Sequence, residues 1–291
     1  MHIQLFFLVS LHLNVYNSFV FMKPAKVLFI CQEIMPYVPE TELSSICRLL
    51  PQSIQDNGSE IRTFMPKYGC INERRNQLHE VIRLSGMNLI IDDNDHPLII
   101  KVASIQAARM QVYFIDNDDF FQRKALVCDE SGIDYFDNDE RSIFFVRGVI
   151  ETVRKLRWTP DIIHCHGWFS ALAPLYIKKA FDDDPCFRDT KIVYSIYNDA
   201  FDQSFRKVFN HKLLVKGLEQ DDISEIKSKA DYLNLTKLAI RYADGIIQAS
   251  PKISSKVKKA AEESGKPFMI AKESEDFSDY SEFYDLLLEQ A

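Results

Sequence analysis

Two histidines separated by one residue are the side chains of this 291-residue chain best placed to do chemistry. His164 and His166 close an apolar run of strand length, and a turn at Gly167 and a segment of helical periodicity to about Lys179 follow. Side chains alternate along a strand, so the two imidazoles share one face and Cys165 lies on the other. Strand, turn and helix form the unit of a parallel sheet, which binds ligands outside the carboxyl ends of its strands. We therefore expect any active-site or ligand-binding cleft to lie at this pair of histidines.

Two other kinds of chemistry are disfavoured at the pair. A metal site would need a third ligand beside His164 and His166, and none is evident; the six scattered cysteines also lack zinc-ligand spacing. A Cys/His hydrolase would need Cys165 beside a histidine, and the alternation points it away from both. The sequence therefore predicts no metal.

The surrounding segments have the pattern of an α/β protein. Strands are predicted at residues 26–31, 60–65, 191–196 and 245–249, and helices at 42–56, 139–156, 232–242, 252–263 (capped by Ser250-Pro251) and about 280–287. Residues 81–116 have short apolar strands separated by turns, which predicts an antiparallel insertion. We predict a Rossmann-like, doubly wound, mostly parallel sheet with an antiparallel β insertion.

The composition restricts which partners and which cellular compartment are compatible with the chain. A net charge of -7 argues against nucleic acid and anionic membranes, which both repel a like-charged surface. Only 9 glycines occur, and neither GxGxxG nor a P-loop is present. Scattered cysteines fit a reducing cytoplasm, so we predict a cytoplasmic location.

The first 21 residues are apolar but interrupted by Asn14 and Asn17. They lack the basic region and cleavage site of a signal peptide, and they are not an uninterrupted apolar span. We expect an over-extended start with Met22 as the initiator, followed by one domain over 22–291. An uncleaved membrane anchor is the alternative.

Four blocks, in order over residues 24–260, resemble the N-terminal catalytic domain of bacterial glycogen and plant starch synthases, glycosyltransferase family 5. The blocks are Val27–Pro36 followed by Leu49-Leu50-Pro51, Pro66-Lys67-Tyr68-Gly69, Pro160–Trp168, and Tyr242–Gly245 followed by Ala249-Ser250-Pro251. The resemblance implies one half of a GT-B fold. It also implies retaining transfer of glucose from ADP-glucose to an α-1,4-glucan, without a metal or other cofactor.

The resemblance suggests sugar-binding residues. His166 resembles the family's sugar-binding histidine, or is a histidine kept at the cleft edge by packing. For His164, one strand step deeper, a structural hydrogen bond is favoured. Asn198 either binds sugar hydroxyls or caps the turn after its strand. Trp168 either stacks on a sugar or, as we favour, is the first core residue of its helix. Lys67 and Tyr68 line the acceptor side or cover their loop.

Departures from the family place the donor site in doubt. Where the family has K-x-G-G-L, this chain has Pro39-Glu40-Thr41-Glu42-Leu43, so the lysine becomes Pro39 and the glycines become Thr41 and Glu42. Side chains hinder the close backbone approach that glycine allows, and carboxylates at a helix start repel a diphosphate.

Three positions near the histidines also depart from the family. The family's Asp, His and His become Gly167, Phe169 and Tyr197, while Asn198 remains. The chain ends where the family's second domain would begin. We expect a glycosyltransferase domain of glycogen metabolism that is inactive alone and needs a protein partner to supply that domain. The alternatives are a non-catalytic glucan-binding or regulatory protein, or a partner of a full-length synthase.

Overall fold

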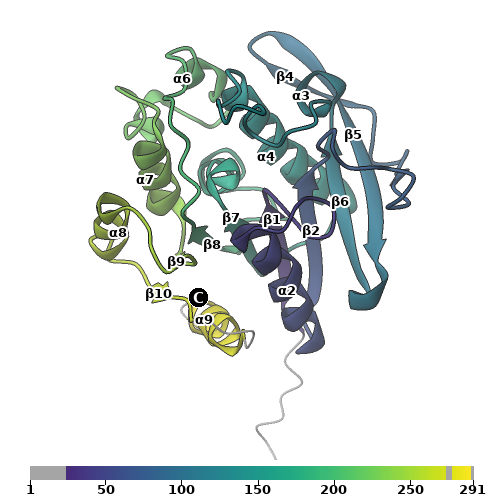
Figure 1. The fold of residues 1–291 in the computed structure, drawn as a ribbon. Helices are drawn as coiled ribbons and strands as arrows, with labels where there is room; N and C mark the ends of the chain where they lie inside the picture. Colours follow the sequence, from purple (N-terminus) through teal and green to yellow (C-terminus); the bar gives the residue numbers. More distant parts are fainter. Residues whose placement is uncertain (1–23, 273–276, 290–291) are drawn as a thin grey trace, which may run out of the picture.

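The computed structural model describes residues 24–272 and 277–289 (Figure 1), so the predictions for residues 1–21 lie outside the described residues. The strands are β1 (Lys26–Cys31), β2 (Glu60–Pro66), β3 (His79–Glu80), β4 (Met87–Ile91), β5 (Asn94–Ile105), β6 (Met110–Asp116), β7 (Ile162–His166), β8 (Lys191–Ile196), β9 (Gly245–Gln248) and β10 (Phe268–Ile270). The α-helices are α2 (Glu42–Asp56), α3 (Asp118–Phe121), α4 (Asn138–Leu156), α5 (Ala173–Leu175), α6 (Phe209–Lys212), α7 (Tyr232–Tyr242), α8 (Ser255–Glu262) and α9 (Ser278–Glu289).

The strands form one sheet in the order β10-β9-β8-β7-β1-β2-β6-β5-β3, with β4 pairing to β5. From β10 to β6 every pair is parallel, which confirms the predicted doubly wound, mostly parallel α/β fold. The order reverses direction at β1, because β2 lies on one side of it and β7 on the other. In such sheets ligands bind at the switch point, outside the carboxyl ends of the strands, and His166 is the last residue of β7.

The predicted antiparallel insertion is present, with one correction. Strands β3, β4 and β5 pair antiparallel, and β5 also pairs antiparallel with β6. Strand β6, which the prediction placed in the insertion, is instead parallel to β2 and belongs to the main sheet. Its buried sequence, with only Gln111 exposed, fits a strand covered on both faces.

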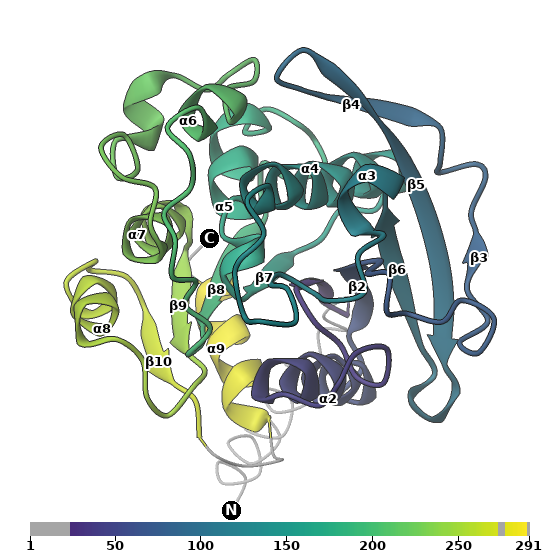
Figure 2. The same ribbon diagram turned by 45° about the horizontal axis from the view of Figure 1, so that its top comes forward.

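Helices cover both faces of the sheet, and helices from early and late in the sequence lie side by side on one of them. Figure 2 shows α2, in purple, beside α9, in yellow, with α4, α5 and α7 on the other face. The register places Cys31 opposite His166 and Phe29 opposite His164, so these four side chains share the face that α2 and α9 cover. Cys165 pairs with Ile30 on the opposite face, as predicted.

Two predicted helices differ in detail. The segment after Gly167 is not one regular helix but a 3₁₀ turn (Trp168–Ser170), the short α5 and a π-turn (Tyr176–Ala180). Pro174 contributes no backbone N–H to this segment, which helps to explain its irregularity. Helix α8 begins at Ser255 rather than Lys252, because Ser250 does not cap it and hydrogen-bonds elsewhere.

No helix within the described ranges combines the length and the apolar character needed to cross a membrane.

Candidate functional site

The two histidines stack on each other in the interior. Their ring centroids are 3.8 Å apart at an interplanar angle of 37°, and both residues are fully buried. The Phe29 ring lies 6.0 Å from each of them. Burial lowers the pKa of both rings, that of His166 to about 3, because a charged imidazole loses its hydration there. The pair is therefore neutral at physiological pH.

Both nitrogens of His164 are occupied. Its Nδ1 lies 2.6 Å from the Tyr284 hydroxyl of α9, and its Nε2 lies 2.7 Å from the Ser195 hydroxyl of β8. A neutral ring has one donor and one acceptor nitrogen, and a hydroxyl can serve either. His164 thus makes structural hydrogen bonds, and it has no free nitrogen with which to join His166 as a metal ligand.

His166 is only half satisfied. Its Nδ1 lies 2.8 Å from the hydroxyl of Tyr197, the residue that replaces the family's histidine. Its Nε2 is buried and has no hydrogen-bond partner among the described residues. A buried polar atom without a partner costs about 1–3 kcal/mol, so the atom calls for a ligand or another explanation.

Helix α9 covers the pair. The ring of Tyr284 meets His164 edge-on at 5.7 Å, and the ring of Tyr280 lies 6.0 Å from His164. The helix sits tightly on β9: a Cβ added at Gly245 would come within 2.8 Å of side-chain atoms of Phe283 and Leu287. Because His166 is fully buried, a sugar could reach it only if residues that cover the pair moved away.

A carboxylate lies just after β8, beside the turn at Gly167. Asp199 accepts a hydrogen bond from the Trp168 backbone N–H at 3.0 Å and another from the Tyr232 hydroxyl at 3.0 Å. Burial raises its pKa to about 6, against the lowering effect of these bonds. Gly167 has a φ of 77°, and an added Cβ there would lie 2.8 Å from Asp199 Oδ2 and from Leu43 Cδ1. The aspartate that the family has at Gly167 would not fit in this arrangement.

The start of α2 is built from the residues that replace the K-x-G-G-L glycines. Thr41 is the N-cap: its hydroxyl accepts from the Ser44 N–H at 3.0 Å and donates to the buried Glu33 carboxylate at 2.9 Å. The Glu42 carboxylate accepts from the Ser250 hydroxyl at 2.5 Å, beyond the end of β9. The helix start that should attract a diphosphate is thus already capped and flanked by two carboxylates.

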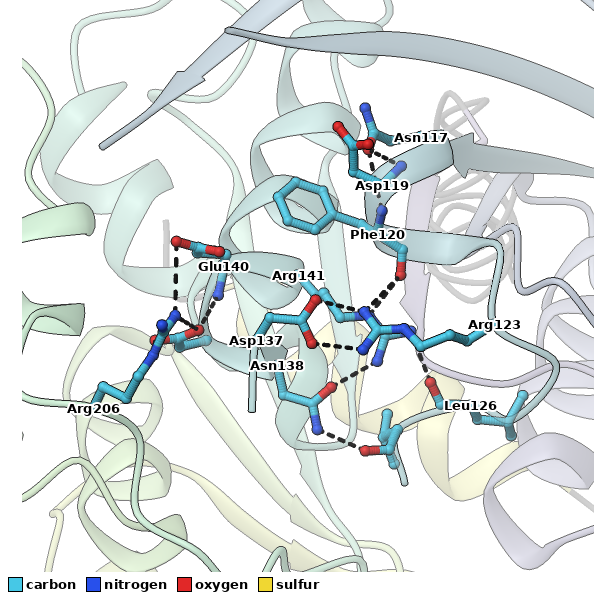
Figure 3. A network of polar contacts seen from close by, with 12 residues as sticks. Asn117, Asp119, Phe120, Arg123, Leu126, Asp137, Asn138, Glu140, Arg141 and Arg206 are labelled. Atoms are coloured by element: carbon cyan, nitrogen blue, oxygen red, sulfur yellow. Dashed lines mark hydrogen bonds and ion pairs between the residues drawn. The ribbon is translucent and has the colours of Figure 1, made fainter. Parts of the chain in front are cut away.

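A polar network around Arg141 holds the loop after α3 (Figure 3), and the Pro66–Gly69 segment packs against this loop. Fully buried Arg141 of α4 donates to the carbonyls of Phe120 and Leu126, both at 2.8 Å, and this holds the loop after α3. A Cβ at Gly69 would lie 1.9 Å from the Gln122 carbonyl oxygen, so the two loops pack backbone to backbone.

The six predicted sugar-binding residues do not form one open site. Tyr68 is fully buried, and its hydroxyl donates to the Gln32 carbonyl at 3.1 Å. Half-buried Lys67 pairs with Glu73 at 2.7 Å. Trp168 is buried in the core, as favoured, with Phe201 at 4.8 Å. Only Asn198 is exposed, and its backbone N–H donates to the Ser250 hydroxyl at 3.0 Å.

Four residues that lie with the histidines at the carboxyl ends of the strands were not singled out from the sequence. Cys47 and Asp199 lie outside the four motif blocks, while Cys31 and Glu33 lie within the first block but received no role there. One signal existed: Cys31 ends the strand next to β7, so parallel pairing places it beside His166.

Residues 26–267 match the family model described as the starch synthase catalytic domain. The chain belongs to this family. It is similar to glycogen synthases of Chlorobaculum parvum (34% identical over 233 residues, 80% of this chain and 47% of the relative) and Chlorobaculum tepidum (36% over 226 residues, 77% and 46%). The chain thus spans about half the length of the curated relatives it matches.

A solved structure shares the fold of this starch synthase family member. It is the catalytic domain of starch synthase IV from Arabidopsis thaliana bound to ADP and acarbose. The TM-score is 0.71 at 18% identity, and the match covers 89% of this chain and 53% of that chain. The GT-B-type fold expected from the motifs is therefore confirmed.

We predict that Tyr284→Phe lowers the free energy of unfolding by about 1–3 kcal/mol, because it leaves a buried His164 nitrogen unpaired. Chemical denaturation measures the change. The matched control is Tyr37→Phe, whose buried hydroxyl has no partner among the described residues, so its removal should be neutral or stabilising. Equal losses in both variants would show that the Tyr284–His164 bond does not hold α9.

A second prediction concerns pH. The folded-state pKa of Asp199 is raised to about 6, so the folded protein binds this proton more tightly than the unfolded chain does. The contribution of Asp199 to stability is therefore present below about pH 4 and is lost as pH rises to about 6. The stability of wild type minus that of Asp199→Asn should fall across this window and stay flat above it. A difference that does not vary between pH 4 and 6 would contradict the raised pKa.

Proposed function

We propose that this chain is a glycosyltransferase domain of the glycogen and starch synthase type that acts in α-glucan metabolism but does not transfer glucose from ADP-glucose by itself. Membership of the family supports the reaction class. The loss of autonomous transfer is supported by the start of α2, where Thr41 and Glu42 occupy the position of the family's donor loop and the Glu33 carboxylate accepts from Thr41.

Electrostatics affects the two substrates of the family, the ADP-glucose donor and the glucan acceptor, differently. A diphosphate brought to this edge meets the carboxylates of Glu33, Glu42 and Asp199, and its charge is repelled. A glucan is neutral, and carboxylate and amide groups pair readily with hydroxyl groups. Exposed Asn198 beside Asp199 is the part of the edge open to such a ligand. Activity would then need a partner that supplies the donor-binding half and opens the buried site at His166.

The carboxylates also support a second candidate, a non-catalytic glucan-binding or regulatory protein, which includes a partner of a full-length synthase. The two candidates differ in one result: only the glycosyltransferase domain should transfer glucose when a second domain of the family is added. The predicted cytoplasmic location is common to both.

Calorimetric titration of the purified chain tests the proposal. We expect maltoheptaose to bind and ADP-glucose not to bind. Asn198→Ala should weaken glucan binding by about tenfold, or 1.4 kcal/mol. Asn88→Ala on β4, an exposed asparagine far from the edge in sequence and strand order, is the matched control and should leave the affinity unchanged. Absence of glucan binding would refute the glucan role and point to a protein ligand only.

A variant with the family's donor loop restored tests the donor site. The triple variant Pro39→Lys/Thr41→Gly/Glu42→Gly rebuilds K-x-G-G-L and changes the net charge by +2. The matched control, Glu40→Lys, changes the charge by the same amount but leaves the start of α2 capped. Only the triple variant should gain ADP affinity, by at least about tenfold. Tight ADP-glucose binding by the unaltered chain would contradict the blocked donor loop.

A further inference from the structure

Three potential metal ligands meet beneath helix α9. Cys31 is the last residue of β1, Cys47 lies on the buried face of α2, and His166 ends β7. All three are fully buried. They are far apart in the sequence, and sequence spacing therefore gave no sign of a metal site.

The ligand atoms are close enough for one ion. The two Sγ atoms and a ring nitrogen of His166 all lie within 4.8 Å of one another. Zinc binds sulfur at about 2.3 Å and nitrogen at about 2.0 Å, so three ligands at tetrahedral or trigonal angles lie about 3.5–4.0 Å apart. Closing the cluster around an ion thus needs the ligand atoms to approach one another by about 1 Å.

The histidine is set up as a ligand. Its Nε2 is buried and has no partner among the residues described, while its Nδ1 is held by the Tyr197 hydroxyl. Ligating histidines commonly use the second ring nitrogen in such a hydrogen bond, which fixes the ring and its tautomer. Burial keeps the ring neutral, the form that binds metals.

We propose that Cys31, Cys47 and His166 form a binding site for a thiophilic d¹⁰ cation, Zn²⁺ or Cu⁺. Two thiolates and an imidazole are the soft donor set that both ions favour. Burial and the neighbouring Cys31 thiol raise the pKa of the Cys47 thiol, so Cys47 gives up a proton when it binds a metal as the thiolate.

Charge and coordination number distinguish the two ions. Two thiolates neutralise Zn²⁺, which suits a dry interior, but zinc then needs a fourth ligand such as water. Cu⁺ is satisfied by three ligands but leaves one negative charge. Either ion would satisfy His166 Nε2 and join β1, α2 and β7, so the site is structural and does not depend on the proposed glucan role.

Metal loading under reducing conditions tests the proposal. The reference is the full chain with Cys70→Ser, Cys128→Ser and Cys186→Ser, which removes the exposed and half-buried thiols. Because the site is buried, the protein is refolded with Zn²⁺ or with Cu⁺ and then dialysed against a weak chelator. We expect about one tightly held ion per chain, with two sulfur ligands and one imidazole nitrogen by X-ray absorption.

Cys47→Ala in the reference should lower retention of the ion by at least about tenfold. The matched control, Cys165→Ala, removes a buried thiol on the opposite face of β7 and should retain it. Circular dichroism establishes folding, and Cys31→Ala is the second variant if Cys47→Ala does not fold. Retention of Zn²⁺ alone or of Cu⁺ alone identifies the ion. No retained ion in the fully reduced reference, or equal retention after Cys47→Ala, overturns the proposal.

Discussion

The structure at the carboxyl ends of the central strands depends on burying the two imidazoles of His164 and His166 in their neutral form. Buried polar groups must be paired, and the partners of His164 and His166 come from elements distant in sequence: Ser195 on β8, Tyr197 just after it, and Tyr284 on α9. Each hydroxyl fixes one ring nitrogen and one element. The pair thereby brings the end of the chain onto the middle of the sheet, over strands formed much earlier in the sequence.

The departures from the family pattern fit one another in this closed arrangement. Gly167 leaves the space that Asp199 and Leu43 fill, Tyr197 holds His166, and Thr41 caps α2 while bonded to Glu33. Glu42 reaches Ser250, whose hydroxyl also receives the Asn198 N–H. The side chains that replace the family's residues therefore each have a partner in this arrangement.

The sequence predicted what local pattern controls. Apolar runs and helical periodicity located β1, β7, β8 and α4, and strand alternation placed His164 and His166 on one face with Cys165 on the other. The irregular segment after Gly167 escaped prediction because it depends on Pro174 and on packing rather than on periodicity. The cover by α9, the raised pKa of Asp199 and the meeting of Cys31, Cys47 and His166 depend on contacts across the whole chain, which no local pattern contains.

The central claim is that α9 is an integral cover of the histidine pair and not a loosely attached end. Hydrogen exchange of backbone amides measures this directly, because amides in one cooperative unit open with similar free energies. We predict that the Phe283–Leu287 amides are protected to nearly the same degree as those of β7 and exchange together with them. Rapid exchange of these α9 amides beside a protected β7 would contradict it, and would mean that the catalytic edge of the family is open in solution.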